Sequence, residues 1–373
     1  MACMMESPEA MLFSHDIFAA QVTGGVSRCM IELMRALDGV GYRPWQSFTG
    51  TNDNALLAEE RKADWFDRHV VGHASRGGRR SALGTLANER QLRRIVSGSG
   101  TRVVHRTYHP IVDLLPSRTT VVETVHDLWD MVARDEAGPR ATLRRRMKRK
   151  ALERADSIIC VSQSTLNYLG DTLPTLVSRA VVIPHGTRRI SDRPVAIDRP
   201  RPFFLFVGKR DRYKNFSILI PALRGLPQDA DLICFGGGAF SNEEQEALAQ
   251  AGLSDRVRQL GGNDDVLAGY YEAACALLYP SKHEGFGLPL LEAMMHGCPV
   301  VAAPLTSLPE VGGTAALYAD ADDADAWTDH MRALMEDGDM RTRMIAAGHV
   351  RGERFSWVGT AQRHVALYED LAS

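Results

Sequence analysis

Residues 281–292, SKHEGFGLPLLE, separate a short apolar run from a longer one, and this pattern decides the fold of the second half of the chain. The preceding residues 276–280, ALLYP, are typical of a buried strand, and Pro289 suits the first position of a helix. We therefore expect Glu284 on a loop at the end of a strand and Glu292 in the first turn of the next helix. This strand–loop–helix unit is typical of an α/β fold.

Two glycines on this loop, Gly285 and Gly287, allow backbone amides to come close to a ligand. The unpaired N–H groups and the positive dipole end of the following helix favour an anion at the same place. A diphosphate at the helix start, with Glu284 and Glu292 binding hydroxyl groups on either side, describes a nucleotide sugar. A loop rich in Gly and Pro is also the ordinary connection of an α/β fold, so the spacing alone leaves both interpretations open.

The size and composition of the chain favour two ordinary globular domains. The chain has 373 residues, of which 45% are hydrophobic and 24% charged, and its net charge is -2. The near-neutral charge argues against a nucleic-acid-binding protein. No apolar stretch approaches the ~20 residues of a membrane span. Residues 1–13 lack the basic start and apolar core of a signal peptide, so we expect a cytoplasmic protein.

The cysteines do not form a recognisable metal or disulfide pattern. They are scattered and include no C-x-x-C pair, so we interpret them as small buried residues of a reducing compartment. They are Cys3, Cys29, Cys160, Cys234, Cys275 and Cys298.

Short, uniformly apolar runs alternate with helix-forming segments in two separate series. Strands are expected in the first series at residues 11–13, 103–105, 121–126, 157–162 and 181–184, and in the second at residues 203–207, 232–235, 276–279 and 299–302. A segment rich in Pro and charge, residues 191–202, lies between the two series and is typical of a linker. Such strands predict parallel sheets covered by helices on both faces, with ligands at the carboxyl ends of the strands.

The stretch 281–292, with GCPVVA (residues 297–302) and SLPEVG (residues 307–312), resembles the E-x7-E region of retaining glycosyltransferases of family 4. The resemblance covers most of the chain and is tightest over residues 203–312. It implies the GT-B fold, in which two doubly wound, Rossmann-like α/β domains face a central cleft. We expect the acceptor-side domain at residues 1–194, the nucleotide-sugar-binding domain at residues 200–356, and a last helix, residues 357–373, that packs back on the first domain.

A basic loop, VGKRDRYKNF (residues 207–216), follows the first strand of the second domain. Arg forms forked bonds to phosphate and Lys supplies a mobile charge, so an anion is the expected partner, and a solvated basic turn is the alternative. The resemblance implies that Arg210 and Lys214 hold the donor diphosphate and stabilise the leaving group, with Lys209 a further candidate. It also implies that Glu284 acts in catalysis. The remaining donor-binding residues that it implies are Gly25, Gly285, Phe286, Gly287, Leu288, Glu292 and Asn263.

In the first domain, GGVSR (residues 24–28) opens a helix, and its glycine pair suits either a phosphate or a tight turn. His126 ends a strand, where a hydrogen-bonded structural role is the alternative to catalysis; the resemblance implies that it contacts the transferred sugar. The acceptor-side candidates are Gly24, Arg28, His105, Tyr108 and His109. The histidines are not spaced as a zinc set, so no metal site is expected.

The run RATLRRRMKRK (residues 140–150) is strongly basic and carries only a thin apolar stripe. A solvated helical face is one interpretation. Contact with anionic lipid or with a lipid-diphosphate acceptor is the other, at about 1 kcal/mol for each basic residue near such a surface.

The sequence therefore predicts a retaining, metal-independent hexosyltransferase with no cofactor. Its donor would be a nucleoside-diphosphate sugar, with a GDP-sugar carrying mannose favoured and a UDP-sugar as the alternative. Its acceptor would be a saccharide, a polyprenyl-diphosphate-linked saccharide or another hydroxyl compound in polysaccharide, lipopolysaccharide or glycoconjugate biosynthesis, with peripheral contact at the inner face of the membrane. A phosphorylase or sugar-nucleotide epimerase of the same fold, and a non-catalytic sugar-nucleotide-binding protein, remain open.

Overall fold

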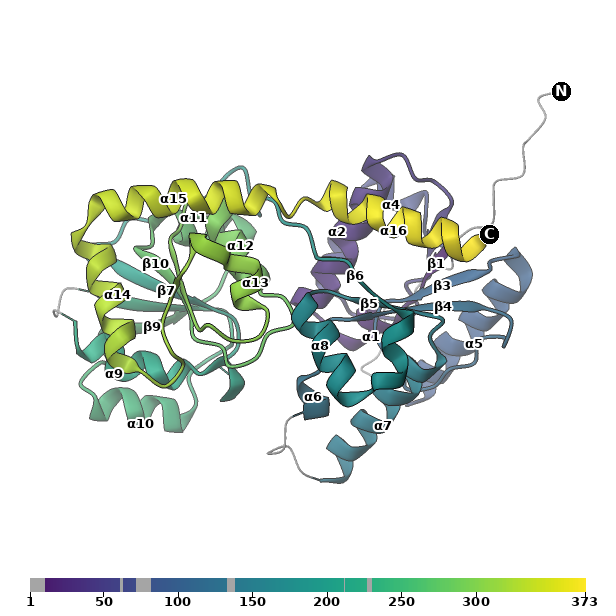
Figure 1. Cartoon of the computed structure of the whole chain (residues 1–373), viewed down its shortest axis with the longest axis horizontal. Helices are drawn as coiled ribbons and strands as arrows, with labels where there is room; N and C mark the ends of the chain where they lie inside the picture. Colours follow the sequence, from purple (N-terminus) through teal and green to yellow (C-terminus); the bar gives the residue numbers. More distant parts are fainter. Residues whose placement is uncertain (1–10, 61–62, 72–81, 133–137, 211, 227–229) are drawn as a thin grey trace. The chain divides into compact units, whose positions relative to one another are not determined.

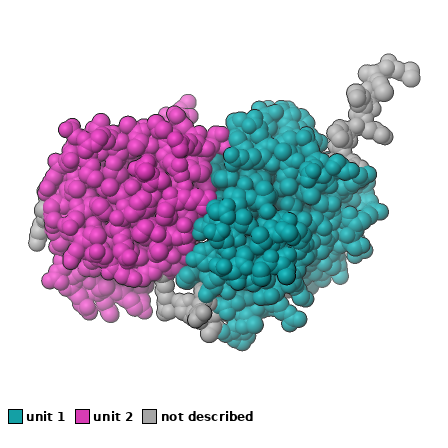
Figure 2. Space-filling model, viewed as in Figure 1, with its two compact units in different colours: residues 1–186, 357–373 teal, residues 187–356 magenta. Residues whose placement is uncertain are grey.

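The computed structural model describes residues 11–60, 63–71, 82–132, 138–210, 212–226 and 230–373. The chain divides into two compact units. Unit 1 comprises residues 1–186 and 357–373, and unit 2 comprises residues 187–356; Figure 2 colours them separately. Each unit is an α/β domain with its own six-stranded sheet.

All strand pairs of unit 1 are parallel, and their order is β2-β1-β3-β4-β5-β6 (Figure 1). The strands are β1 (Met11–Phe13), β2 (Trp45–Ser47), β3 (Val103–Arg106), β4 (Thr120–Val125), β5 (Ser157–Cys160) and β6 (Ala180–Val182). The helices are α1 (Asp16–Ala20), α2 (Gly25–Gly39), α3 (Ala55–Glu60), α4 (Asp64–Asp67), α5 (Ala82–Ser99), α6 (Trp129–Val132), α7 (Pro139–Arg154), α8 (Gln163–Thr172), the 3-10 helix η1 (Pro174–Arg179), and α16 (Trp357–Ala372).

The sheet of unit 1 has a hydrophobic core on each face because alternate side chains of a strand point to opposite sides. On one face, Val122 packs in a core with Leu33 of α2 and Tyr368 of α16. On the other face, Val125 packs in a core with Leu152 of α7. The last helix of the chain therefore completes the core of unit 1.

Unit 2 repeats this plan with all strand pairs parallel and the order β12-β11-β10-β7-β8-β9. The strands are β7 (Phe203–Val207), β8 (Asp231–Phe235), β9 (Val257–Leu260), β10 (Ala276–Tyr279), β11 (Val300–Ala302) and β12 (Leu317–Tyr318). The helices are η2 (Arg212–Lys214), η3 (Phe216–Ile218), α9 (Leu219–Arg224), α10 (Asn242–Gln250), α11 (Asp264–Ala273), α12 (Leu288–Met295), α13 (Leu308–Gly312), η4 (Gly313–Ala315), α14 (Ala324–Glu336) and α15 (Gly338–Glu353).

The predicted fold class, two doubly wound parallel sheets, is confirmed, with differences of detail. Helix α12 begins at Leu288, so Pro289 is its second residue and Glu292 lies in the second turn, not the first as expected. The proline-rich segment that was interpreted as a linker packs on unit 2. Within this segment, the hydroxyl of Ser191 donates to the Asp265 carboxylate (2.5 Å), and the N–H group of Val195 donates to the Asp265 carbonyl (2.9 Å).

The place where α16 joins unit 1 depends on a glycine. A Cβ atom on Gly186 would overlap the backbone and ring of Trp357, so only glycine allows the two segments to approach so closely. Among the described residues, no helix is both long enough and apolar enough to cross a membrane.

Candidate functional site

The loop between β10 and α12 in unit 2 is held by hydrogen bonds at Glu284 and Phe286. The N–H group of Glu284 donates to Thr306 Oγ1 (3.0 Å), and Ser307 Oγ donates to the carbonyls of Glu284 and Phe286 (3.0 Å each). Gly287 caps α12 with φ +98°, where a side chain would be strained and would meet Leu308 at 2.8 Å. The fixed loop holds the amides that precede α12 in place, which suits an anion at the helix start.

Lys214 lies against this loop, although 70 positions of sequence separate it from Glu284. Its ammonium group pairs with the Glu284 carboxylate and lies over the ring of Tyr279 (5.4 Å). The Lys282 N–H group also donates to the Tyr213 carbonyl (2.7 Å), so the two loops are joined through backbone as well. The structure thus brings together two of the predicted catalytic residues, Lys214 and Glu284.

Arg210 occupies a different environment from the one expected. Its Nε donates to Glu244 of α10 (2.8 Å), and its Nη2 donates to the carbonyls of Gly238 and Ala239 (2.9 Å each). The guanidinium also lies over the ring of Phe240 (4.6 Å), and the side chain is only 4% exposed. The donors of Arg210 therefore bind groups of the protein itself.

Lys209, the neighbour of Arg210, is exposed, and among the described residues none forms a hydrogen bond or ion pair with its ammonium group. The backbone explains the difference between the two cations. Gly208 has φ +115°, and a Cβ on Gly237 would lie 2.5 Å from the Gly208 carbonyl and 2.9 Å from Arg210 Nη1. The two glycine turns thus pack together and enclose Arg210 between them.

The second glutamate of the motif, Glu292, accepts a hydrogen bond from the hydroxyl of Tyr271 on α11 (3.3 Å). Tyr271 is fully buried and stacks on His296, with ring centroids 6.0 Å apart. Asn263 caps α11, because its side chain accepts from the Val266 N–H group (3.1 Å). The side chain of Asn263 therefore has a structural role, and the donor-binding role that the resemblance implies for Asn263 stays a prediction. Tyr271 is a residue of the site that the sequence analysis missed.

In unit 1, the predicted glycine loop precedes α2, and its helix start is already capped. Gln21 Oε1 accepts from the N–H group of Ser27 (3.3 Å) and from its hydroxyl (3.1 Å). A Cβ on Gly24 would overlap this Gln21 side chain, whereas Gly25 is exposed with open space beside it. Arg28 follows on α2 and is half-buried. A phosphate at this helix start would therefore have to displace the side chain of Gln21.

His105, an expected acceptor contact, belongs to the core instead. It is fully buried; its Nδ1 forms a hydrogen bond with the Tyr368 hydroxyl (2.6 Å) and its Nε2 with Thr124 Oγ1 (2.8 Å). Burial holds the pKa of His105 well below its usual range. A substrate cannot reach either ring nitrogen, so the acceptor prediction for His105 is wrong.

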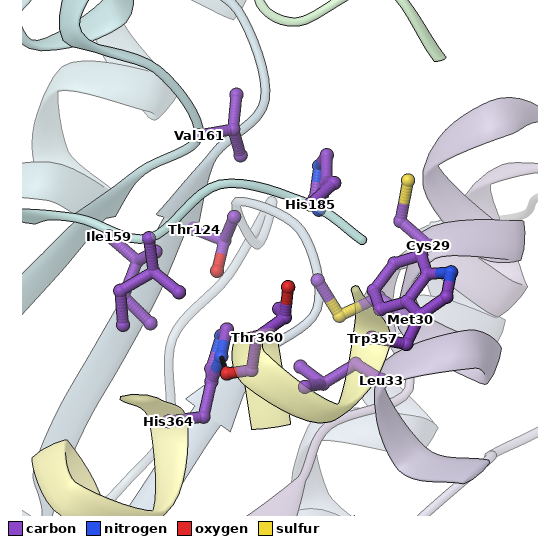
Figure 3. A pocket seen from close by; sticks show the side chains of 11 residues that line it. Cys29, Met30, Leu33, Thr124, Ile159, Val161, His185, Trp357, Thr360 and His364 are labelled. Atoms are coloured by element: carbon purple, nitrogen blue, oxygen red, sulfur yellow. Dashed lines mark hydrogen bonds between the residues drawn. The ribbon is translucent and has the colours of Figure 1, made fainter. Parts of the chain in front are cut away.

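An apolar pocket beside His105 contains two further histidines. Figure 3 shows His185 and His364 lining it, together with Thr124 of β4 and Trp357 of α16. Burial lowers the pKa of His364 to about 4 and that of His185 well below the usual value. These histidines are neutral at pH 7, and their aromatic surroundings fit a structural role.

His126 follows the last residue of β4, Val125, whereas the sequence predicted that His126 itself ends the strand. Its ring stacks on that of His185 (5.4 Å), and burial followed by the charge of Lys148 lowers its pKa to about 3. Its Nε2 is shielded from solvent and has no hydrogen-bond partner among the described residues. A second pocket includes His126 together with the predicted acceptor-side residues Tyr108 and His109. This pocket is the polar candidate site of unit 1.

Two residues of this second pocket, Glu123 and Lys148, were missed by the sequence analysis. Glu123 interrupts the apolar run of residues 120–125, and a carboxylate inside a buried strand is itself a signal of a special environment. Lys148 lies in the basic run but is buried, and its Nζ bonds to the Asp130 carboxylate (2.7 Å) and the Asp127 carbonyl (2.7 Å). The loop after β4 and helix α7 are therefore fastened together at this pocket.

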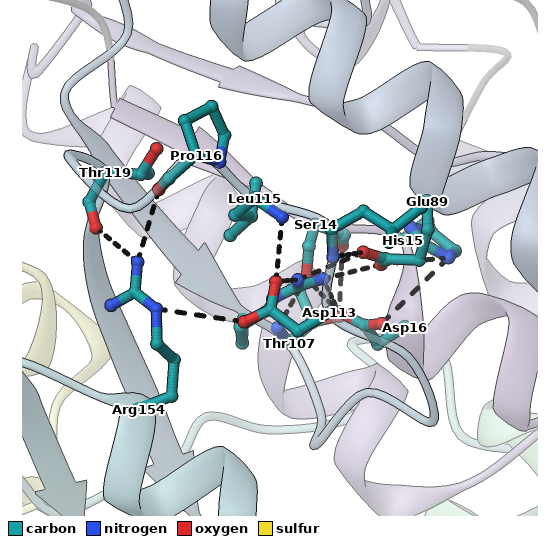
Figure 4. Close-up of polar contacts among 12 residues, drawn as sticks. Ser14, His15, Asp16, Glu89, Thr107, Asp113, Leu115, Pro116, Thr119 and Arg154 are labelled. Atoms are coloured by element: carbon teal, nitrogen blue, oxygen red, sulfur yellow. Dashed lines mark hydrogen bonds and ion pairs between the residues drawn. The ribbon is translucent and has the colours of Figure 1, made fainter.

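Figure 4 shows a buried charge network at the carboxyl ends of β1 and β3. Arg106 donates to Glu89 (2.7 Å), Asp113 (2.7 Å) and Asp16 (3.3 Å). Among the described residues, His15, Asp16 and Glu89 are close enough together to ligate a metal ion. The guanidinium of Arg106 already supplies positive charge to these carboxylates and would repel a cation, so this group does not fit a metal site.

The rest of the basic run forms the exposed face of α7. Leu143 is 57% exposed there, whereas Arg145 turns inward and donates to the Asp130 carbonyl (2.6 Å). The exposed cations of this face are Arg140, Arg144, Arg146, Arg149 and Lys150.

Comparisons with known proteins agree with this architecture. Residues 23–188 match the model described as Glycosyltransferase Family 4, and residues 187–351 match the model described as Glycosyl transferases group 1. An O-antigen chain mannosyltransferase B of Escherichia coli is 35% identical over 175 residues, which are 45% of this chain and 46% of that protein. A phosphatidyl-myo-inositol mannosyltransferase of Mycobacterium leprae is 33% identical over 213 residues, 54% of this chain and 56% of that protein. The chain spans about half the length of these curated relatives.

Solved structures share the fold over nearly the whole chain. A sucrose-phosphate synthase from Thermosynechococcus elongatus superposes with a TM-score of 0.74 at 24% identity, covering 97% of this chain and 98% of that one. Anabaena HepE in complex with UDP-glucose superposes with a TM-score of 0.74 at 16% identity, covering 97% and 99%. Both likenesses concern the fold, which is GT-B. Since the two family models together cover residues 23–351, the chain belongs to the GT-B glycosyltransferases that join a family 4 domain to a group 1 domain.

Proposed function

We propose that the protein is a retaining hexosyltransferase that moves a sugar, with mannose favoured, from a nucleoside-diphosphate sugar to a hydroxyl group of a saccharide or lipid-linked acceptor. Its place would be the biosynthesis of cell-surface polysaccharide or glycoconjugates. The observation that carries this proposal is the pairing of Lys214 with Glu284 at the fixed loop before α12. A cation, a carboxylate and a helix start meet there, which is the set that a diphosphate linked to a sugar requires.

The diphosphate would bind at the start of α12, where it competes with Glu284 for the ammonium group of Lys214. We correct the predicted basic pair at this point: Lys209 is exposed and takes the place of Arg210, whose donors are committed to Glu244 and to backbone carbonyls. The two lysines and the amides would stabilise the charge that develops on the departing diphosphate, which is the main catalytic contribution. Because this positive charge comes from the protein, we propose that the reaction needs no metal ion.

Glu284, once released from Lys214, would orient the hydroxyls of the donor sugar, and Glu292 would accept from the ribose hydroxyls. Retention follows if the acceptor attacks on the face that the diphosphate leaves and the leaving phosphate takes the acceptor's proton. A double displacement would need a nucleophile under the anomeric carbon, and the sequence nominates none.

The nature of the donor is inferred from the relatives. Two of them are named as mannosyltransferases, which supports a mannose donor, whereas Anabaena HepE was solved with UDP-glucose, which keeps a UDP-sugar as the alternative. A thermal-shift screen with GDP, UDP, GDP-mannose and UDP-glucose decides the base, because bound ligand raises stability as RT ln(1 + [L]/Kd). A protein that responds to none of the four does not bind such a donor.

The reaction class is tested by chromatography of the nucleotide products. A transferase releases free nucleoside diphosphate from the donor only when an acceptor such as methyl α-D-mannoside is present. A phosphorylase would release the nucleoside diphosphate when inorganic phosphate is supplied in place of the acceptor. An epimerase would change the sugar without releasing the nucleoside diphosphate. Lys214→Met should lower the rate of transfer by roughly 100- to 1000-fold, as expected for the loss of one group that stabilises a developing charge.

For the acceptor, we propose that the exposed cationic face of α7 contacts an anionic membrane surface or a lipid-linked diphosphate. Its five exposed cations would contribute about 1 kcal/mol each near such a surface. Co-sedimentation with phosphatidylglycerol vesicles, but not with pure phosphatidylcholine vesicles, is the expected result, and it should weaken in high salt. The variant Arg146→Glu with Arg149→Glu should not bind. The matched control, Arg93→Glu with Arg94→Glu on α5, changes the charge equally on another exposed helix.

A further inference from the structure

Glu123 has the environment of a ligand-binding carboxyl group. It lies near the carboxyl end of the central strand β4, in register with Arg106 of β3 and Ile158 of β5, and it is 2% exposed. Its Oε2 is shielded from solvent and has no hydrogen-bond partner among the described residues. Leaving a buried polar atom without a hydrogen-bond partner is unfavourable, so an orphaned carboxyl oxygen needs an explanation.

The nearest cations do not neutralise Glu123. Side chains in register on parallel strands point to the same face of the sheet, so Arg106 is the natural partner. Its Nη atoms, however, donate to Glu89 and Asp113 (2.7 Å each). Lys148 lines the same pocket as Glu123, but its ammonium group bonds to Asp130 (2.7 Å). The structure therefore provides Glu123 with no dedicated counter-charge among the described residues.

The absence of a partner favours the neutral acid form of Glu123. Burial, reinforced by the charges of Asp16 and Asp113, raises the pKa of this carboxyl well above its usual value, and Arg106 and Lys148 oppose the effect only in part. A protonated carboxyl group can both donate and accept a hydrogen bond. Two other titratable side chains of the pocket, His109 and His126, are also neutral, since their pKa values are lowered to about 4 and about 3. The lining further includes Tyr108 and Asp127, and the Asp127 carboxylate lies 3.7 Å from the ammonium group of Lys148.

A second orphaned atom lines the same pocket. His126 Nε2, also shielded and without a partner among the described residues, lies within the lining that includes Glu123. The rings of Tyr108 and His109, whose centroids lie 3.9 Å apart with a tilt of 34°, form part of the pocket wall. Two unsatisfied polar atoms and an aromatic wall in one pocket describe a place prepared for a polar ligand.

The charges and hydrogen-bonding capacities identify the class of that ligand. A phosphate or carboxylate would need a free cation, and the ammonium of Lys148 is already paired. A hydroxyl group fits, because it can accept from a protonated carboxyl while it donates to a neutral imidazole, and the apolar face of a sugar packs on aromatic rings. We propose that this pocket is a subsite for a sugar hydroxyl group and that Glu123 is the residue that selects it. This inference rests on the proposed sugar transfer and names a specificity-determining residue for it.

The experiment uses the full chain and three variants. Glu123→Gln keeps the shape and can still donate and accept, Glu123→Leu keeps the volume but removes both functions, and Glu153→Leu is a control on the exposed part of α7. Far-UV circular dichroism and melting curves establish that each variant is folded. Transfer from GDP-mannose and from UDP-glucose is measured with methyl α-D-mannoside as the acceptor. Two series of monodeoxy analogues follow, one of the acceptor and one of the donor sugar, so that the source of the bound hydroxyl is distinguished.

The expected result is a loss of discrimination at one hydroxyl position. The wild-type protein and Glu153→Leu should transfer to or from one monodeoxy analogue roughly 10- to 100-fold less efficiently than the parent sugar, because the pocket is then left unsatisfied. Glu123→Leu should process the parent and that analogue equally, and Glu123→Gln should keep most of the discrimination. A merely structural role of Glu123 would lower both rates together and leave their ratio unchanged.

The pH profile gives an independent readout. Transfer by the wild-type protein should fall at alkaline pH as Glu123 ionises, and Glu123→Gln should not show this decline. If Glu123→Leu keeps the wild-type ratio for every analogue, the subsite assignment is overturned while sugar transfer stands. If the wild-type protein transfers sugar from neither donor, the proposed function itself fails, and the subsite fails with it.

Discussion

Removing the guanidinium of Arg210 should destabilise unit 2 without removing a donor-binding group. Removing the ammonium of Lys209 should weaken donor binding without destabilising unit 2. Arg210→Ala deletes an ion pair with Glu244 and two hydrogen bonds to carbonyls, each worth about 1 kcal/mol net, together with a contact over Phe240 worth about 1 kcal/mol. Water can replace part of the bonding at the exposed carbonyls. The expected loss is therefore roughly 2–4 kcal/mol, or about 5–12 °C in melting temperature for a domain of this size.

Lys209→Ala tests the other half of this prediction. Its side chain is exposed, so the melting temperature should change by less than about 2 °C, within the range of ordinary surface substitutions. The loss of a cation that faces a diphosphate should weaken donor binding by roughly 10-fold or more.

The assay is a thermal melt of both variants with and without saturating GDP or UDP, followed by calorimetric titration of the nucleotide. Titrating Arg210→Ala at a temperature well below its melting point separates binding from stability. If Arg210→Ala melts like the wild-type protein but no longer binds nucleotide, the reasoning is refuted and Arg210 returns to the donor site. Normal binding by Lys209→Ala would equally remove Lys209 from it.

Three further outcomes are expected. Tyr271→Phe removes only the hydroxyl that holds Glu292, and it should raise the Kd for GDP or UDP by roughly 3- to 10-fold. The corresponding 2′,3′-dideoxynucleotide should bind the variant and the wild-type protein equally. If the variant binds both the nucleotide and its dideoxy analogue more weakly than the wild-type protein does, the role assigned to Tyr271 is contradicted. Burial lowers the pKa of His364 to about 4, so the unfolded chain gains protons first as the pH falls below about 6.5, and the stability that is present above that pH is lost toward about pH 4. The loss of stability between pH 7.5 and 5.0, measured by urea denaturation, should be smaller by roughly 2 kcal/mol in His364→Gln than in the wild-type protein, and an equal loss in both proteins would refute the assignment. Glu123 has a raised pKa, so its contribution to the stability of the folded protein is complete below about pH 4.5 and is lost as the pH rises. Glu123→Gln should therefore raise the free energy of unfolding at pH 7 by up to roughly 3 kcal/mol. If the free energy of unfolding does not rise, the carboxyl of Glu123 is ionised in the folded state.

The fold could be predicted from the sequence because the fold depends on local patterns of apolar residues. Short apolar strands such as residues 203–207 and 276–279 can be buried on both faces only in a parallel sheet with helices on each side. The same reasoning placed Glu284 and Lys214 at strand ends, and strand ends of one parallel sheet meet at one edge. Their pairing in the structure follows from that geometry.

The choice between neighbouring side chains could not be predicted in this way. Whether Lys209 or Arg210 faces outward depends on the left-handed turns at Gly208 and Gly237, which are set by contacts between two loops. His105 is a similar case. It lies near the end of a strand, where a catalytic histidine is also found, but its partner Tyr368 lies 263 positions further along the chain, and the packing of α16 contributes to its burial.

The division of unit 1 into two segments of sequence has a consequence for how the molecule is made. A ribosome releases residues 187–356 before residues 357–373, so the contiguous unit 2 can fold while the core of the other unit still lacks Tyr368. Until the last helix emerges, the apolar surfaces of α2 and of the sheet that it will cover remain open to water or to a chaperone. Nascent chains halted before residue 357 should accordingly resist proteases in unit 2 and be cleaved in the incomplete unit 1.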